Sequence, residues 1–225
     1  LNWESVGADG YRIYRYRPEN GAYEVFKDVK VNSVINDDLL PAYSCAFRIK
    51  AYKIVDGKRV YSEYSSLFWA LTLPDKVKKV TASNITSDSI TLSWNSAQRI
   101  DSYKVYLVGD EEDILIYEGS DTSYVFDGAL PFAEHSFYII ATATERSNYV
   151  ESVPSDVLTV KTKAAVIKEF SASDITADSY KISWPEQPNA VGYNIYRLDA
   201  GEYTLISSVD VPFIEFTELE NSKND

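Results

Sequence analysis

The chain has 225 residues, of which 45% are hydrophobic and 14% aromatic, and it carries a formal net charge of −12. This charge, without a basic stripe, argues against nucleic acid as a partner, and no apolar run reaches the roughly 18 residues of a membrane-spanning helix. A single cysteine, Cys45, excludes an internal disulfide and a cysteine-rich metal site.

Alternation with a period of two residues starts close to the N-terminus and indicates strands with one buried face. In "AFRIKAY", residues 46–52, one face holds Phe47, Ile49 and Ala51, and the other holds Arg48, Lys50 and Tyr52. The dipeptides Asn20-Gly21 and Asp56-Gly57 fit short hairpin loops on either side of this region. The first third of the chain therefore predicts antiparallel strands.

The same alternation continues through the rest of the chain. One face of "SITLSW", residues 89–94, holds Ile90, Leu92 and Trp94, and one face of "YKVY", residues 103–106, holds Tyr103 and Val105. Ala200-Gly201 marks a further hairpin loop. No segment has a helical period, so short strands separated by turns predict a β-sandwich.

An internal repeat divides the chain. "TASNITSDSITLSW" ends at Trp94, "SASDITADSYKISW" ends at Trp184 90 positions later, and the two share 8 of 14 residues. Trp3 stands 91 positions before Trp94. Each Trp is followed by a similar strand, "GYRIY" from Gly10, "SYKVY" from Ser102 and "GYNIY" from Gly192. A period of about 90 residues is the size of a small independent domain.

Together these motifs resemble the fibronectin type III module. The resemblance rests on the Trp of the second strand, the "GYRIY" type of third strand, and a sixth-strand pattern shared by "LPAYSCAFRIKAY" and "LPFAEHSFYIIAT". The likeness is greatest to modules of secreted or cell-surface proteins of Gram-positive bacteria. It implies an all-β fold of tandem immunoglobulin-like sandwiches, three modules with the first and last incomplete. Because this sandwich hosts many roles, it says little about function.

The repeat also predicts where the modules lie. We expect module one at residues 1–74 without its first strand, a complete module two at 75–163, and module three at 164–225 without its last strands. The joining segments "LTLPDKV" and "VKTKAAV" are short and lack Gly-Ser character, which favours a semi-rigid rod. The incomplete ends predict a monomeric slice of a longer protein, or alternatively head-to-tail strand exchange between copies.

Cys45 and His135 occupy equivalent positions of the repeat, 90 residues apart. They therefore belong to different modules and cannot form a Cys–His nucleophilic pair within one chain. In the family that the chain resembles, this position carries the tyrosine of a corner that bonds back to the preceding turn. We expect both residues to be structural filler, with His135 still able to donate a hydrogen bond to that turn and Cys45 able only to pack or donate weakly.

The acidic run "GDEEDI", residues 109–114, has four carboxylates that suggest either calcium binding or glycosidase chemistry. It lacks the alternation of a calcium loop and offers no cleft, so we interpret it as a solvated hairpin tip. The triplet "NIT" at Asn84 is a formal glycosylation sequence, but its counterpart is "DIT" at Asp174, which indicates a turn-forming position. No metal site, cofactor site or catalytic residue is expected.

The recurring tyrosines are the strongest candidates for binding. Tyr14, Tyr106 and Tyr196 recur at the outward position of the third strand, where flat rings can stack on sugars or anchor a protein. The alternative is that they form ordinary cross-strand pairs with long side chains such as Arg48. Because the rings recur with the fold, ordinary sheet stability is the simpler interpretation.

The resemblance implies a non-catalytic protein, secreted or on the cell surface, whose modules act as spacers or interaction modules and position other domains. The alternative function is a carbohydrate-binding or adhesive module that uses the outward tyrosines. Its partner would be a protein or a polysaccharide at the cell surface, without membrane insertion.

Overall fold

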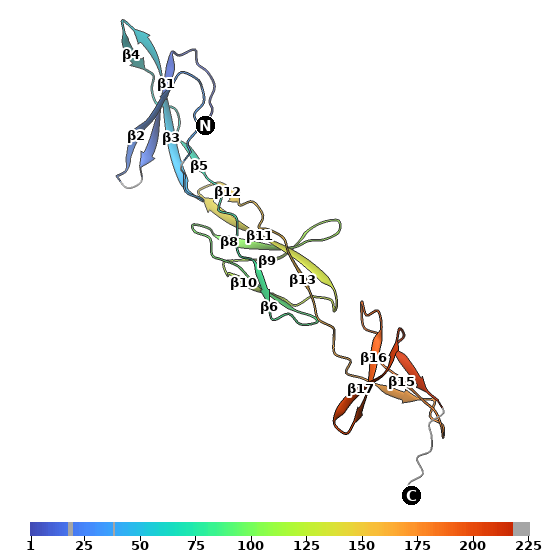
Figure 1. Cartoon of the computed structure of the whole chain (residues 1–225). Coiled ribbons are helices and arrows are strands. Elements are labelled where there is room, and N and C mark those ends of the chain that lie inside the picture. Colours follow the sequence, from blue (N-terminus) through green and yellow to red (C-terminus); the bar gives the residue numbers. More distant parts are fainter. Residues whose placement is uncertain (18–19, 38, 218–225) are drawn as a thin grey trace.

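The computed structural model describes residues 1–17, 20–37 and 39–217, and the regular elements in this part are all strands. Figure 1 shows three groups of strands that follow one another along the chain. We call them the first segment (residues 1–74), the middle segment (75–163) and the last segment (from residue 164). No helix capable of crossing a membrane occurs among the described residues.

The first segment is dominated by one antiparallel sheet, in the order β2-β1-β3-β4, with β5 paired to the other part of β3. Its strands are β1 (Gly10–Arg17), β2 (Ala22–Val29), β3 (Ser44–Val55), β4 (Lys58–Tyr61) and β5 (Phe68–Leu71). The predicted hairpin loops are confirmed, because Gly21, Asp56 and Gly57 all have positive φ angles. Opposite this sheet lies an isolated bridge between Asn2 and Ser33.

The middle segment is a two-sheet sandwich. One sheet, in the order β10-β7-β6, contains β6 (Thr81–Ser83), β7 (Ile90–Ser93) and β10 (Ser123–Phe126). The other, in the order β12-β11-β8-β9 with β13 beside β11, contains β8 (Ser102–Leu107), β9 (Ile114–Gly119), β11 (Glu134–Glu145), β12 (Asn148–Glu151) and β13 (Leu158–Lys161). Both sheets bury their facing side chains in one core, which includes Ile90, Leu92, Val105, Phe137 and Ile139. The predicted all-β sandwich is confirmed.

The last segment has two smaller sheets. One, in the order β14-β15-β18, contains β14 (Ser171–Ser173), β15 (Tyr180–Ser183) and β18 (Phe213–Phe216), and the other pairs β16 (Tyr193–Asp199) with β17 (Glu202–Val209). Ala200 and Gly201 form the β16–β17 turn with positive φ angles, as predicted. Within the described residues, β17 is the only strand that pairs with β16.

One predicted face is wrong. The alternation of "AFRIKAY" places Tyr52 outward with Arg48 and Lys50, yet Tyr52 is buried, with a relative exposure of 5%. Gly10 lies opposite Tyr52 in the β1–β3 register and leaves room for the ring. Tyr61 packs edge-on against that ring, at 5.7 Å between centroids, and the Arg59 guanidinium lies over it at 4.5 Å. The neighbours of Tyr52, which alternation does not report, decide its burial.

A charged cluster ties three strands of the first segment together. Arg12 donates two hydrogen bonds to Asp28, from Nε at 2.8 Å and from a terminal nitrogen at 2.9 Å, and Arg59 donates a third. These bonds lower the pKa of Asp28 from 3.8 to about 2, the Arg12 bond having the largest effect. The carboxylate therefore stays ionised well into the acid range.

This pKa predicts how acid affects the first segment. Asp28 has a lower pKa folded than unfolded, so its stabilisation is complete above pH 3.8 and is lost as the pH falls through about 2. Asp28→Asn should remove this dependence and lower the free energy of unfolding by about 1 kcal/mol, a modest value because the pair is partly screened by water. Amide exchange in β1 and β2 between pH 2 and 5 measures both the pH dependence and the change in the free energy of unfolding. Asp199→Asn is the control in the last segment, and equal pH slopes in the wild type and Asp28→Asn would contradict the assignment.

Candidate functional site

The three candidate tyrosines lie on the outward side of equivalent strands but in different surroundings. Tyr14 makes an edge-on contact with Tyr64 at 5.1 Å, and its pKa is raised mainly by burial. Tyr106 stacks on Tyr138 at 5.0 Å with an interplanar angle of 11°. Tyr196 is 53% exposed. The structure therefore does not bring the three rings into one site, and two of them already have aromatic partners.

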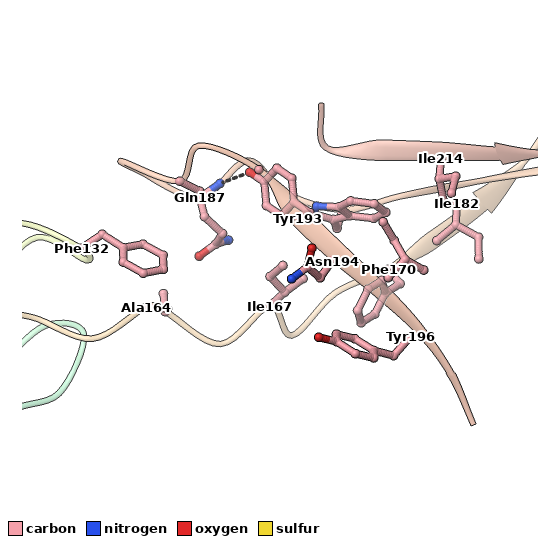
Figure 2. A pocket seen from close by; sticks show the side chains of 15 residues that line it. Phe132, Ala164, Ile167, Phe170, Ile182, Gln187, Tyr193, Asn194, Tyr196 and Ile214 are labelled. Atoms are coloured by element: carbon pink, nitrogen blue, oxygen red, sulfur yellow. Dashed lines mark hydrogen bonds between the residues drawn. The ribbon is translucent and has the colours of Figure 1, made fainter. Parts of the chain in front are cut away.

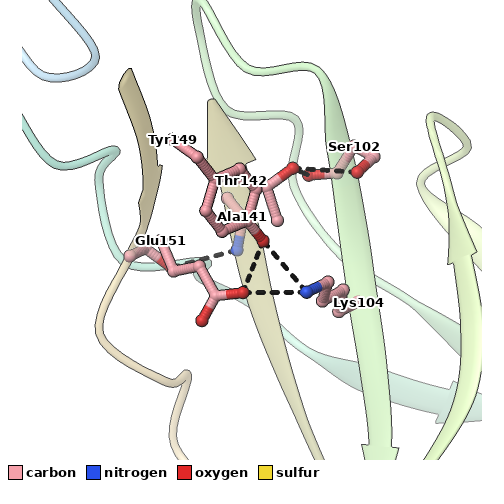
Figure 3. Close-up of polar contacts among 7 residues, drawn as sticks. Ser102, Lys104, Ala141, Thr142, Tyr149 and Glu151 are labelled. Carbon is pink, nitrogen blue, oxygen red and sulfur yellow. Dashed lines mark hydrogen bonds and ion pairs between the residues drawn. The ribbon is translucent and has the colours of Figure 1, made fainter. Parts of the chain in front are cut away.

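On the middle segment the outward face is balanced in charge. Lys104 donates to the Tyr149 hydroxyl at 2.9 Å and to Glu151 Oε1 at 2.8 Å, and Tyr149 also donates to Glu151 (Figure 3). The contact with Lys104 lowers the pKa of Glu151, and the contact with Glu151 raises the pKa of Lys104. Each charge is neutralised by its neighbour, so the cluster supplies no free acid, base or nucleophile.

The acidic run forms the turn between β8 and β9. Asp113 accepts a hydrogen bond from the Gly109 amide at 3.3 Å and another from the Tyr138 hydroxyl at 2.9 Å. No group of three or more metal-ligating side chains occurs among the described residues. Asp113 thus serves the turn and the Tyr106–Tyr138 pair, as expected of a hairpin tip. The equivalent residues Asn84 and Asp174 both have positive φ, which confirms that this position forms a turn.

Cys45 and His135 pack where the repeat predicts. Cys45 is buried beside Ile13 and Phe47, and burial raises the pKa of its thiol, which disfavours the nucleophilic thiolate. His135 is bonded to the preceding turn, but in the opposite direction from the prediction. Its Nε2 accepts a hydrogen bond from the Leu130 amide at 3.2 Å instead of donating one. The reason is that this turn presents an N–H to the ring.

A cavity of about 560 Å³ opens between the two sheets of the last segment (Figure 2). Its walls include Ile182, Trp184, Tyr193 and Ile195. The equivalent positions of the middle segment, including Leu92, Trp94 and Tyr103, belong to a core that β11 and β13 cover. The cavity therefore has the composition of a sandwich core and lacks the convergent polar groups of a ligand site.

A more distinctive arrangement recurs at the loop after each Trp. The Trp and the following Tyr pack edge-on in all three segments, with centroid distances of 5.2 Å for Trp3–Tyr11, 5.6 Å for Trp94–Tyr103 and 5.3 Å for Trp184–Tyr193. The Tyr hydroxyl then accepts a backbone N–H from the intervening loop. In the middle segment the donor is Ala97 at 2.7 Å, and in the last segment it is Gln187 at 2.9 Å. The core thus holds a loop that points toward the preceding segment.

At each of the two junctions, a side chain of that loop donates a hydrogen bond to a proline carbonyl of the preceding segment. Arg99 donates from Nε to the carbonyl of Pro41 at 2.9 Å, and Asn189 donates from Nδ2 to the carbonyl of Pro131 at 2.9 Å. Both donors have positive φ angles, 56° and 59°. Donors and acceptors are each 90 positions apart, so the contact repeats with the period of the modules. We call this recurring contact the junction clamp.

The acceptor side of the clamp is held as firmly as the donor side. After Pro41, the Ala42 amide donates to the Leu73 carbonyl at 3.0 Å, and the Thr72 hydroxyl donates to the Leu40 carbonyl at 2.7 Å. At the second junction, Phe132 bonds Lys163 and Thr162 bonds Leu130 in the same way. The turn that carries each acceptor carbonyl is therefore tied to the start of its own linker.

The first junction has one further contact. Arg146, in the turn between β11 and β12, lies over the Trp69 ring of β5 at 3.9 Å from its centroid. The position equivalent to Trp69 at the second junction is Thr159, which cannot make this contact. A cation over a tryptophan face contributes about 0.5–1 kcal/mol at an exposed site. Among the described residues, the first junction therefore has this cation–ring contact in addition to its clamp bond, and the second has its clamp bond without such a contact.

The geometry of the middle segment agrees with a comparison of its sequence. Residues 75–157 match the fibronectin type III domain. A segment of two fibronectin type III domains from chicken tenascin is 24% identical, over 72% of this chain and 90% of that one, with a TM-score of 0.46. The fibronectin type III domain of human fibronectin type III domain containing protein 3 is 20% identical, over 40% of this chain and 86% of that one, with a TM-score of 0.34.

Reasoning from the 90-residue repeat missed the junction residues. Arg99 and Asn189 are equivalent in position but differ in type, so neither forms a visible motif. Tyr64 and Trp69 were also missed, because no strand pattern predicts that they lie beside Tyr14 and Tyr16. The available signal was the repeat of Leu-Pro at positions 40–41 and 130–131, which marks the turns that carry the acceptors.

Proposed function

We propose that this chain is part of a larger secreted or cell-surface protein and acts as a non-catalytic spacer that holds neighbouring domains at a set distance and orientation. The observation that carries the proposal is the junction clamp, which repeats with the same atoms of the proline carbonyl at both junctions. Fibronectin type III domains generally serve as spacer or interaction modules, which agrees with this role.

The clamp suits a spacer because both of its halves belong to rigid parts of the fold. The donor loop is fixed by a buried Trp–Tyr pair, and the acceptor turn is fixed by the threonine that follows β5 or β13. The first and middle segments also have separate hydrophobic clusters, centred on Phe47 and on Phe137, so each can keep its shape under load. If the junctions are stiff, the length of the chain is set by the lengths of its segments, and the domains on either side are held at that distance.

The clamp predicts different effects at the two junctions. Asn189→Ala removes the side-chain hydrogen bond that the described residues make across the second junction and should broaden the distribution of angles there. Arg99→Ala should have a smaller effect, because Arg146 still lies on Trp69. Small-angle X-ray scattering of the full chain measures the effect of each variant as a change in the spread of particle lengths.

Arg197→Ala is the matched control, because Arg197 pairs with Asp199 within one hairpin, away from the junctions. It should leave the scattering unchanged. A wild-type chain that is already as broadly distributed as Asn189→Ala would overturn the proposed spacer function. The same would follow if neither clamp variant differed from Arg197→Ala.

A further inference from the structure

The outward face of the first segment carries a continuous stripe of rings and cations. It runs across strands β1, β2, β3 and β5 and the loop before β5, and we call it the cation–tyrosine stripe. Its members are Tyr14, Tyr16, Tyr23, Arg48, Lys50, Tyr64 and Trp69. Tyr64, at 42% exposure, lies openly on the surface, and the others are half-buried.

The contacts along the stripe are unbroken. Lys50 lies over the Tyr64 ring at 4.1 Å, and Arg48 lies between Tyr64 at 5.8 Å and Tyr23 at 4.8 Å. From Tyr23 the line continues to Tyr16 at 5.2 Å between centroids, and from Tyr16 to Trp69 at 6.2 Å. The rings therefore hold the two cations in place along a surface that crosses the sheet.

The positive charges of the stripe have no carboxylate partner among the described residues. In the described part of the chain, neither Arg48 nor Lys50 forms an ion pair with a carboxylate. The neighbouring Asp28 is already bound by Arg12 and Arg59. The Nε of Arg48 is buried without a hydrogen-bond acceptor, and the guanidinium contacts the rings of Tyr23 and Tyr64. On a chain of net charge −12, this is a local reversal of sign.

The equivalent face of the middle segment shows that the fold does not require such a stripe. Arg48 is replaced there by Tyr138, Lys50 by Ile140, and Trp69 by Thr159. Tyr138 donates to Asp113, and Lys104 pairs with Glu151. The same sheet therefore forms with its charges balanced, and the unbalanced cations of the first segment are available for a partner.

We propose that the cation–tyrosine stripe binds an anionic polysaccharide. Carboxylate, sulfate or phosphate groups of such a chain would bind Arg48 and Lys50, which are held as donors without acceptors. The apolar faces of the sugar rings would pack on the tyrosines, whose rings offer large contact area with little conformational freedom to lose. This binding goes beyond the spacer role and does not depend on stiff junctions.

The charge of the whole chain favours a polysaccharide over a single-stranded nucleic acid. Nucleic acid also stacks on rings beside cations, but its backbone carries one charge per nucleotide and needs a long basic track. The stripe has two unpaired cations and is surrounded by an acidic protein, which repels a polyanion of high charge density. A polysaccharide with spaced acidic groups places its charges on the cations and its neutral parts elsewhere.

Isothermal titration of the full chain with hyaluronate, whose carboxylates stand on alternate sugars, and with the same polymer as its methyl ester, tests the proposal. The two probes share the same sugar backbone, and the ester replaces each carboxylate with an uncharged methyl ester. We expect binding of the acid form that weakens with added salt, and binding of the ester that is about tenfold weaker or undetectable. Lys50→Gln and Tyr64→Ala should each weaken binding of the acid form by about five- to tenfold, as loss of a charge and of a ring contact.

Lys104→Gln and Tyr149→Ala are the matched controls on the middle segment, and both should bind as the wild type does. Amide exchange in β1 and β3 confirms that Lys50→Gln and Tyr64→Ala remain folded. Equal binding of polyglutamate would show that charge alone acts, and equal or tighter binding of single-stranded DNA would show a nucleic-acid surface. Either outcome overturns the proposal, as does no binding of hyaluronate or an equal loss in the controls.

Discussion

Replacing Trp94 with alanine is expected to lower the free energy of unfolding of the middle segment by about 3–5 kcal/mol. Trp94 is buried at 5% exposure and packs edge-on against both Tyr103 and Tyr117. The substitution removes the largest side chain of the core and leaves a cavity that both sheets border. Amide exchange of β7, β8 and β11 in the full chain reports the loss for this segment alone, which matters because several segments need not unfold together.

Trp94→Phe separates packing from polarity. The Nε1 of Trp94 is buried without a hydrogen-bond acceptor, as are those of Trp3 and Trp184. Phenylalanine keeps a ring in place and removes this unsatisfied donor, which by itself costs about 1–3 kcal/mol when buried. Trp94→Phe should therefore destabilise the segment less than Trp94→Ala does. Equal losses for the two variants would show that the ring does not fill the core as described.

The second large effect is expected for Tyr103→Phe. The ring stays buried, but the Ala97 amide loses its acceptor, and we expect a loss of about 1–2 kcal/mol. The more specific result concerns the junction. The loop from Ala97 to Arg99 loses its hydrogen bond to the core, so exchange of its amides should become faster and the hydrogen bond from Arg99 to Pro41 should weaken.

Tyr117→Phe is the matched control for that variant. Tyr117 also packs on Trp94, but its hydroxyl bonds Asp121 in another loop. It should leave the exchange of residues 97–99 unchanged. If Tyr103→Phe lowers stability without loosening this loop more than Tyr117→Phe does, the core does not position the clamp.

Much of the fold follows from patterns that are local in sequence. The alternation in "SITLSW" identifies Ile90 and Leu92 as core residues, and both are fully buried. Hairpin signals such as Asp56-Gly57 work because few residues adopt the positive φ angles that a tight turn needs. The 90-residue repeat then carries each assignment to the other segments. These features could be predicted because a few neighbouring residues determine them.

The features that were missed depend on contacts between distant residues. Tyr52 is buried because Gly10 lies opposite it, a pairing set by the register of two strands that are far apart in sequence. The clamp joins Arg99 to a backbone carbonyl, and any carbonyl looks alike in a sequence. The stripe gathers rings from three strands and a loop, so no single segment shows it. In each case tertiary packing, not residue type, decides the outcome.

The central claim is that the junctions hold the segments at fixed orientations. Residual dipolar couplings of backbone amides in the full chain test this most directly, because each segment reports its own alignment. We predict one common alignment tensor for the first and middle segments, and a tensor of nearly the same magnitude for the last segment. In the Asn189→Ala variant, the magnitude of the tensor of the last segment should fall. Tensors of clearly different magnitude for the first and middle segments of the wild-type chain would contradict the claim.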